Sequence, residues 1–462
     1  MVALSGDKSK AEAAKEAQQL LNDLLMKYRE VEAAIRADSP AYAALIHPSP
    51  LSLSKIQQLL DPQTLLLEYW LGENSSYVWL VGRNSFRSYK LTDRGRIEKE
   101  AERFYGLLTA RQPVAGETPA QWQQRQANTR VQYPASTEAL SRLILGPVAA
   151  DLGNKRLLIV PDGSLHYVPF AALPVPGAAQ TRKPQCPATG CLLVHEHEIV
   201  SLPSASVLAA LRGRNAEGTA PRKTAIVFAD PVFNRNDERV GRKPTAPITQ
   251  QTFLTPRILE RELKDAGFSA DLPRLRASAR EAHAVDFYDP SKGVSQLLNF
   301  DASRKRFLSA ELQDFRIVHL ATHAFIDNNH PELSGLVLSL VDANGAPQDG
   351  YLRLHEIYNL QIPAELVVLS ACNTALGKRV TGEGLIGLTR AFMYAGAQRV
   401  MATLWKVDDE AAEEEMGRMY QHLLAEGKPP AAALRAAQLD MLKSTRWPAP
   451  YYWSAFVLQG EW

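Results

Sequence analysis

The sequence predicts an α/β protein in which helices cover both faces of a parallel sheet. Short apolar and β-branched runs alternate with helical segments along most of the 462-residue chain, which is the pattern of buried parallel strands. The hydrophobic share of 45% and the charged share of 22% are ordinary for a globular protein with a large core. No repeat with a period of roughly 20 to 50 residues appears, so the chain itself is not a solenoid.

Composition excludes several classes of protein. Lysine plus arginine (52) nearly equals aspartate plus glutamate (50), so no basic excess is present to hold a nucleic acid backbone. No apolar run approaches the roughly 18 residues of a membrane span, and the first residues lack the layout of a signal peptide. Three cysteines are too few for a disulfide framework. We therefore expect a soluble protein of a reducing compartment, the cytoplasm, that binds neither nucleic acid nor membrane.

Residues 1–50 are the first of three expected regions, an N-terminal helical segment. Apolar residues recur three and four positions apart over residues 14–35, the spacing of a heptad seam. Asp38, Ser39 and Pro40 end the helix. The seam could lie on the following domain or pair with another chain. An activating or inhibiting partner protein is expected to dock through this helix.

Residues 51–215 are expected to form a smaller α/β unit. Residues 110–135 are rich in Gln, Pro, Ala and Thr without an apolar period, which indicates a loop. A linker at 212–223 ends the unit. The expected helices are 54–60, 96–109 and 140–152, and the expected strands are 65–70, 77–81, 85–91 and 156–160.

Residues 216–462 are expected to form the larger unit, in which strands and helices alternate regularly. Gly396 is expected to close one of its helices as a C-cap. The expected strands are 224–229, 316–322, 336–341, 366–371, 399–405 and 451–458, and the expected helices are 257–266, 385–394, 409–425 and 430–442.

Two of these strands end on reactive side chains, His323 and Cys372, which are 49 residues apart. The carboxyl ends of parallel strands share one edge of a sheet, where ligands bind. A cysteine thiolate is a nucleophile, and a neighbouring imidazole can lower its pKa or protonate a leaving amine. The spacing is equally compatible with a buried structural cysteine and a hydrogen-bonded core histidine.

Six ordered motifs resemble the CHAT family, the caspase-like and separase-related cysteine peptidases. The similarity is dense over residues 300–462 and continues weakly through residues 158–173. The motifs lie at residues 319–324, 331–339, 366–374, 382–397, 404–409 and 451–460.

The resemblance implies a caspase-like parallel-sheet sandwich with helices on both faces, preceded by a degenerate pseudo-caspase unit at 51–215. It implies that His323 and Cys372 are the catalytic dyad and that the backbone N–H groups of Ala324 and Cys372 form the oxyanion hole. The family usually has glycine where this chain has Ala324. A turn with positive φ would be strained by alanine, whereas a turn with negative φ would accept it.

In separase-like relatives, an acidic residue after the Leu-Trp strand reads a basic side chain before the scissile bond. Asp408 and Asp409 occupy that stretch here, just after Trp405, and the three residues are the candidate substrate-binding set. A carboxylate pairs well with arginine or lysine. Either aspartate could instead cap the helix that follows, and both roles could coexist.

The resemblance therefore predicts a cysteine endopeptidase that cleaves a protein or peptide substrate after a basic residue, needs no cofactor or metal, and is under regulatory control. Bacterial members often carry tetratricopeptide repeats, so this chain could lack a repeat region. Two other classes stay open: a catalytically idle CHAT interaction module and a nucleotide-binding regulatory domain.

Two further motifs are discounted. A glycine fingerprint at residues 382–387 is separated from its strand by ten residues, which is too many for a dinucleotide-binding turn. Cys186, Cys191, His195 and His197 have spacings that fit no standard zinc site. The two histidines alternate with glutamates, as on a half-exposed strand.

Overall fold

The computed structural model describes residues 26–27, 50–114, 116–177, 186, 190–214, 223–241, 272–325, 334–370, 372–373 and 383–462, with backbone only at 214, 372–373 and 383–385. The chain divides into two compact units, Met1–Pro50 and Leu51–Trp462, and the second is described here. Most of the predicted helix at 1–38 and all of the predicted helix at 257–266 lie outside the described residues.

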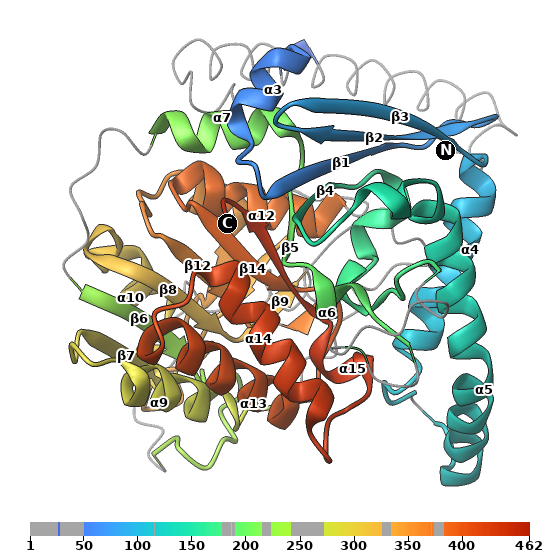
Figure 1. The fold of residues 1–462 in the computed structure, drawn as a ribbon. Helices are drawn as coiled ribbons and strands as arrows, with labels where there is room; N and C mark the ends of the chain where they lie inside the picture. Colours follow the sequence, from blue (N-terminus) through green and yellow to red (C-terminus); the bar gives the residue numbers. More distant parts are fainter. Residues whose placement is uncertain are drawn as a thin grey trace, which may run out of the picture. The chain divides into compact units, whose positions relative to one another are not determined.

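The second unit is organised around an eleven-stranded sheet with the order β3-β2-β1-β4-β5-β15-β14-β12-β8-β6-β7 (Figure 1). The central strands β12, β8 and β6 are parallel and almost wholly buried. Strands β1, β2 and β3 form an antiparallel meander at one end, and β15 is antiparallel to β14. The sheet is thus mixed rather than purely parallel. Its strands are β1 Thr64–Trp70, β2 Ser76–Gly82, β3 Ser85–Leu91, β4 Arg156–Val160, β5 Ile199–Ser201, β6 Lys223–Ala229, β7 Val294–Leu298, β8 Phe315–Ala321, β12 Leu366–Leu369, β14 Arg399–Thr403 and β15 Phe456–Gly460.

This sheet crosses the predicted boundary at 215/216. Strand β5, from the predicted smaller unit, pairs with β15 through Ser201 and Gln459. The eleven-stranded sheet therefore contains strands from both predicted units, and Leu51–Trp462 forms one compact unit.

A second, four-stranded sheet lies at the end of the central strands, with the order β11-β10-β9-β13. Its strands are β9 His323–Phe325, β10 Gly335–Val337, β11 Tyr351–Arg353 and β13 Cys372–Asn373. Strand β9 begins two residues after β8 ends, and β13 begins three residues after β12 ends, so this small sheet lies at the ends of the two central strands. A turn follows at residues 342–345, where the Gly345 N–H donates to the Asp342 carbonyl, and the strand predicted at 336–341 is shorter than predicted.

Helices cover both faces of the large sheet. Helices α9, α13 and α14 lie side by side on one face (Figure 1), where Tyr420 of the α13 end contacts His319 of β8. On β6, Val227 is the register partner of His319, and the next residue, Phe228, faces the opposite side of the sheet. There Phe228 packs on Phe307 of α10. The helices are α3 Leu53–Leu59, α4 Arg94–Leu108, α5 Pro119–Ile144, α6 Leu193–Glu196, α7 Ala205–Arg214, α9 Ser278–Tyr288, α10 Arg304–Ser309, α11 Leu354–Tyr358, α12 Glu383–Ala395, α13 Asp409–Tyr420, α14 Pro430–Lys443 and α15 Pro450–Trp453.

The loop predicted at 110–135 is wrong for most of its length, because α5 begins at Pro119. A capping box between Thr118 and Gln121 starts the helix, and proline at the first position is already set for helical φ. The buried residues of α5 lie only in its second half, from Ser136 onward. Its first half is solvated and so carries no apolar period in the sequence.

Two other predictions need correction. The last strand begins at Phe456 rather than at 451, because the short helix α15 starts with Pro450 and covers the preceding residues. His195 lies on the short helix α6, and both His195 and His197 are buried rather than on a half-exposed strand. No helix among the described residues has the length and apolarity to cross a lipid bilayer.

Candidate active site

The small sheet brings His323 and Cys372 to neighbouring positions. Strand β8 is parallel to β12 in the large sheet, and the extensions β9 and β13 keep that pairing. The register of β13 against β9 places Cys372 beside His323 and Asn373 beside Ala324. The backbones of the predicted nucleophile and base are thus adjacent at the carboxyl edge of the sheet.

The imidazole of His323 is held in one orientation. Its Nε2 lies 2.8 Å from the carbonyl oxygen of Pro273, and a carbonyl can only accept, so Nε2 carries the proton. The ring also packs on Phe233, with 4.9 Å between ring centroids. Its Nδ1 is buried and has no hydrogen-bond partner among the described residues. That nitrogen keeps a free lone pair, which is what a proton acceptor needs.

Burial sets the charge of this histidine. The residue is 1% exposed, and desolvation lowers the pKa of His323 to about 4, whereas the hydrogen bond with the Pro273 carbonyl has a smaller, opposite effect. The Lys406 charge lowers it further. At neutral pH the imidazole is neutral and can accept a proton.

Ala324 fits its position without strain. It lies within β9, paired with Leu336 on one side and Asn373 on the other. The described non-glycine residues with positive φ are Asp230, Lys292 and Asn299, and Ala324 is not among them. Of the two turn geometries considered from the sequence, the one that accepts alanine is present.

The two candidate aspartates have different surroundings. Asp408 is exposed and caps α13, its carboxylate accepting from the backbone N–H groups of Glu410 and Ala411. Asp409 is half-buried, and its Oδ2 accepts from the backbone N–H of Ala277 at 2.9 Å. Desolvation raises the pKa of Asp409 to about 6. The capping role belongs to Asp408, which leaves Asp409 as the carboxylate that faces inward.

Asp409 lines a small cavity at the end of β12. The cavity holds about 10 Å³, no more than one water molecule. Ser370, which lies two residues before Cys372, is part of its wall. The remaining described lining includes Leu275, Ser278, Glu281, Thr403 and Phe456. A larger side chain would have to widen the cavity to enter.

Trp405 does not present a ring to solvent. Its side chain is 1% exposed, its indole N–H donates to the Tyr451 carbonyl at 3.0 Å, and it stacks on the Tyr451 ring. The predicted contact between Trp405 and a substrate is therefore unsupported. Sequence reasoning also missed Pro273, Ser370 and Glu281, whose roles depend on contacts between distant segments.

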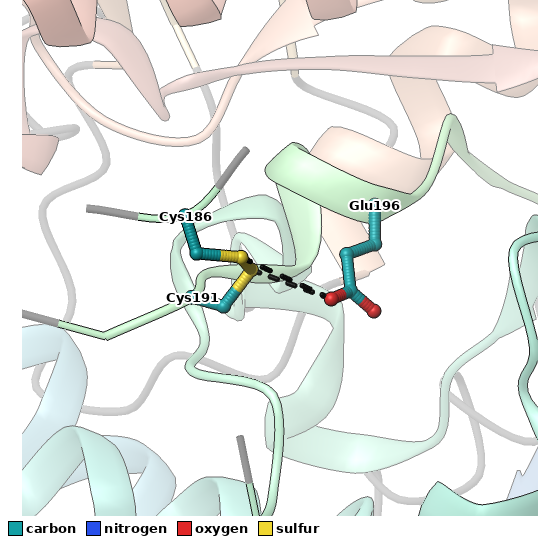
Figure 2. A group of neighbouring side chains, drawn as sticks. All are labelled: Cys186, Cys191 and Glu196. Atoms are coloured by element: carbon teal, nitrogen blue, oxygen red, sulfur yellow. Dashed lines mark hydrogen bonds between the residues drawn. A yellow bond between two sulfur atoms is a disulfide. The ribbon is translucent and has the colours of Figure 1, made fainter. Parts of the chain in front are cut away.

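Two cysteines outside this site are joined. Cys186 and Cys191 form a disulfide, and the Glu196 carboxylate lies 3.4 Å from the Cys191 sulfur (Figure 2). These three residues are the only group among the described residues whose donors could converge on a metal. A disulfide offers no thiolate, so the oxidised pair is not a zinc site.

The family model of the CHAT domain matches residues 134–461, more than two thirds of the chain. The chain belongs to the CHAT domain family. Curated relatives of this CHAT protein include mouse Tetratricopeptide repeat protein 28, which is 38% identical over 332 residues, and human Tetratricopeptide repeat protein 28, which is 37% identical over 114 residues. The matches cover 68% and 25% of this chain but only 12% and 4% of those proteins.

Two solved structures are similar to this chain, and one of them shares its fold. The separase of the Saccharomyces cerevisiae separase–securin complex aligns with a TM-score of 0.53 at 10% identity, covering 88% of this chain and 30% of that one. The Porphyromonas gingivalis RgpB pro- and mature-domain complex aligns with a TM-score of 0.37 at 13% identity, covering 79% of this chain and 76% of that one. The alignment with the separase–securin structure confirms the caspase-like α/β fold expected from the motifs.

Proposed function

We propose that this CHAT protein is a cysteine endopeptidase with Cys372 as nucleophile and His323 as base. The observation that carries the proposal is the parallel register of Cys372 with His323, together with the free, buried Nδ1 of that histidine. With Nε2–H bound to the Pro273 carbonyl, Nδ1 is the nitrogen that can accept a proton.

The chemistry follows from these groups. His323 Nδ1 takes the proton of the Cys372 thiol, and the thiolate adds to the carbonyl carbon of the scissile peptide. The backbone N–H groups of Ala324 and Cys372, which lie on the neighbouring strands β9 and β13, are the proposed donors to the resulting oxyanion. The imidazolium then protonates the leaving amine, and water hydrolyses the thioester with His323 again as base. No cofactor or metal is required for these steps.

We propose that the residue before the scissile bond is basic. Asp409 supplies a carboxylate in a cavity that begins two residues from the nucleophile, and Glu281 adds a second carboxylate to the same wall. Two acidic groups in a partly desolvated pocket favour a guanidinium or ammonium over other side chains. A partner protein that controls the reaction is part of the same proposal.

An idle interaction module is the second candidate, and the size of the cavity favours it. A space of about 10 Å³ does not admit a lysine or arginine side chain, so the described conformation is closed to such a substrate. A scaffold would never need to open this cavity, whereas a peptidase would open it on binding substrate or activator.

The deciding experiment is a proteome-wide search for new N-termini that compares the intact protein with Cys372→Ala. The proposal expects cuts after arginine or lysine that depend on Cys372, and labelling of Cys372 by a thiol-directed peptidyl warhead that His323→Ala abolishes. A Cys186→Ser/Cys191→Ser double variant is the matched control, and it should retain both the cleavage of substrates and the labelling of Cys372. Full biological effect in Cys372→Ala, with no new termini, would establish the module instead.

A further inference from the structure

One short segment, residues 273–277, contacts both parts of the candidate active site. Its first residue, Pro273, offers the carbonyl that binds His323 Nε2. Its last residue, Ala277, donates its N–H to Asp409. Leu275, between them, lines the same small cavity as Asp409. The position of this 273–277 segment therefore sets the orientation of the base and the form of the pocket together.

Asp230 contacts the segment through Arg274. It follows directly on β6, at the same sheet edge as His323, and it is 2% exposed. Its two carboxylate oxygens accept from Arg274 Nε at 2.9 Å and Nη2 at 2.6 Å. This bidentate pairing fixes the plane of the guanidinium as well as its distance, so Arg274 and its neighbour Pro273 have little freedom.

The backbone adds a second tie between Asp230 and the end of the segment. Asp230 donates its N–H to the Ser278 hydroxyl at 2.9 Å, and that hydroxyl donates to the Leu275 carbonyl at 2.7 Å. Asp230 also adopts a φ of +48°. An aspartate in the left-handed region costs about 1 kcal/mol or more, and such strain concentrates at functional sites.

A second arginine fixes Asp230 itself. Arg239 contacts the Asp230 carboxylate at 3.0 Å and donates to its backbone carbonyl at 2.7 Å. Asp237 accepts from the same guanidinium. The carboxylate that holds Arg274 is thus anchored by the loop that follows β6.

We propose that Asp230 is a positioning residue, which through Arg274 fixes the 273–277 segment and with it the Pro273 carbonyl that sets the tautomer of His323. The inference rests on the proposed peptidase function for its kinetic consequence, but not for its structural one. If the carbonyl moves, Nε2–H loses its acceptor, and the proton can reside on Nδ1 instead. A histidine protonated on Nδ1 cannot accept the thiol proton there.

The kinetic test compares Asp230→Asn and Arg274→Lys with the intact protein. Asp230→Asn removes the negative charge of the Asp230–Arg274 pair. Arg274→Lys keeps the positive charge but cannot form the bidentate hydrogen bonds of a guanidinium. Each should lower kcat by about 100-fold with a smaller change in KM, because a misplaced base weakens the transition state more than substrate binding. Glu356→Gln is the matched control, since it removes another paired, partly buried carboxylate that bonds Arg304 and lies outside this site.

The second measurement is independent of activity. Nitrogen-15 NMR of histidine-labelled protein reports which ring nitrogen of His323 carries the proton, with His323→Gln supplying the assignment. The intact protein and Glu356→Gln should give the Nε2–H form, and Asp230→Asn and Arg274→Lys should gain the Nδ1–H form. If the protein cleaves nothing but the tautomer shifts, the positioning role stands and the peptidase proposal fails.

The inference is overturned if both Asp230→Asn and Arg274→Lys fold and keep the tautomer of the intact protein. Thermal melting decides whether each variant folds. Should Asp230→Asn not fold, Arg274→Lys carries the test, because its change is confined to a side chain that is 26% exposed.

Discussion

The backbone N–H of Ala277 donates to the Asp409 carboxylate over 2.9 Å. This bond occupies one oxygen of the carboxylate that we propose binds the basic side chain of the substrate. A basic side chain that enters the cavity would have to share that oxygen with the Ala277 N–H or displace the N–H from it. The two adjacent aspartates therefore divide into a pocket residue and a capping residue, which single substitutions can separate.

Asp409→Asn should lower kcat/KM on arginine or lysine substrates by about 100-fold, because a charged hydrogen bond in a desolvated pocket is lost. Asp408→Asn is the control: asparagine caps helices nearly as well, so activity and stability should stay close to those of the intact protein. Asp408→Ala should cost about 1 kcal/mol of unfolding free energy. A basic preference unchanged in Asp409→Asn would refute the pocket assignment.

The pH dependence should show two separate acid limbs. Asp409, with a pKa of about 6, loses its charge below that pH, so KM for basic substrates should rise there. His323, with a pKa of about 4, must be neutral to accept a proton, so kcat should fall only near that lower pH. Profiles measured with the intact protein and Asp409→Asn check this, since the upper limb should vanish in the variant. A KM that is flat between pH 5 and 7 would contradict the assignment.

Ala324→Gly should not improve activity. Alanine already occupies an extended strand position without positive φ, so glycine relieves no strain there. Glycine within a strand should instead cost about 0.5–1 kcal/mol of unfolding free energy. Chemical denaturation measures this loss, and turnover should remain within about twofold. A large gain in turnover would mean that the alanine does displace the oxyanion hole.

The thiol content should reveal the disulfide. The chain has three cysteines, and two of them are joined, so unfolded, unreduced protein should titrate one thiol with Ellman's reagent and reduced protein should titrate three. The single thiol should disappear in Cys372→Ala. Three thiols before reduction would show that the pair is reduced in the purified protein.

Glu415→Leu should stabilise the protein at neutral pH. Glu415 is fully buried on α13, and neither carboxylate oxygen has a hydrogen-bond partner among the described residues. Burial raises the pKa of Glu415 well above its usual value. The contribution of this proton uptake to stability is present in full below the unfolded-state pKa and is lost as pH rises through the folded-state pKa. The gain, on the order of 1 kcal/mol at pH 8, should shrink on acidification.

A neighbouring glutamate provides the control for that measurement. Glu414 is partly exposed and pairs with Arg418, so Glu414→Gln should change stability by less than about 0.5 kcal/mol at either pH. A Glu415→Leu variant that loses stability at every pH would show that the carboxylate has a structural role.

The sequence predicted the elements that decide the site, because the strands ending at His323 and Cys372 are buried on both sides and so carry continuous apolar runs. It could not predict the contact between Pro273 and His323, since these residues are 50 positions apart and the contact is made by a single backbone carbonyl. A carbonyl acceptor leaves no signature in side-chain chemistry.

The first half of α5 escaped prediction for a different reason. Its residues are mostly exposed, so no apolar stripe marks it, and Pro134 inside the helix reads as a break. Likewise, the division of labour between Asp408 and Asp409 depends on where the helix begins, which patterns in the sequence fix only to within a few residues.

The pairing of β5 with β15 has a practical consequence for anyone trimming the protein. Expressed alone, residues 216–462 would leave β15 as a bare, apolar sheet edge, since its described neighbour on that side comes from residues 199–201. Bare edges of this kind recruit other chains into aggregates. Residues 216–462 should therefore be insoluble by themselves, and co-expression with residues 51–215 as a separate polypeptide should restore their solubility.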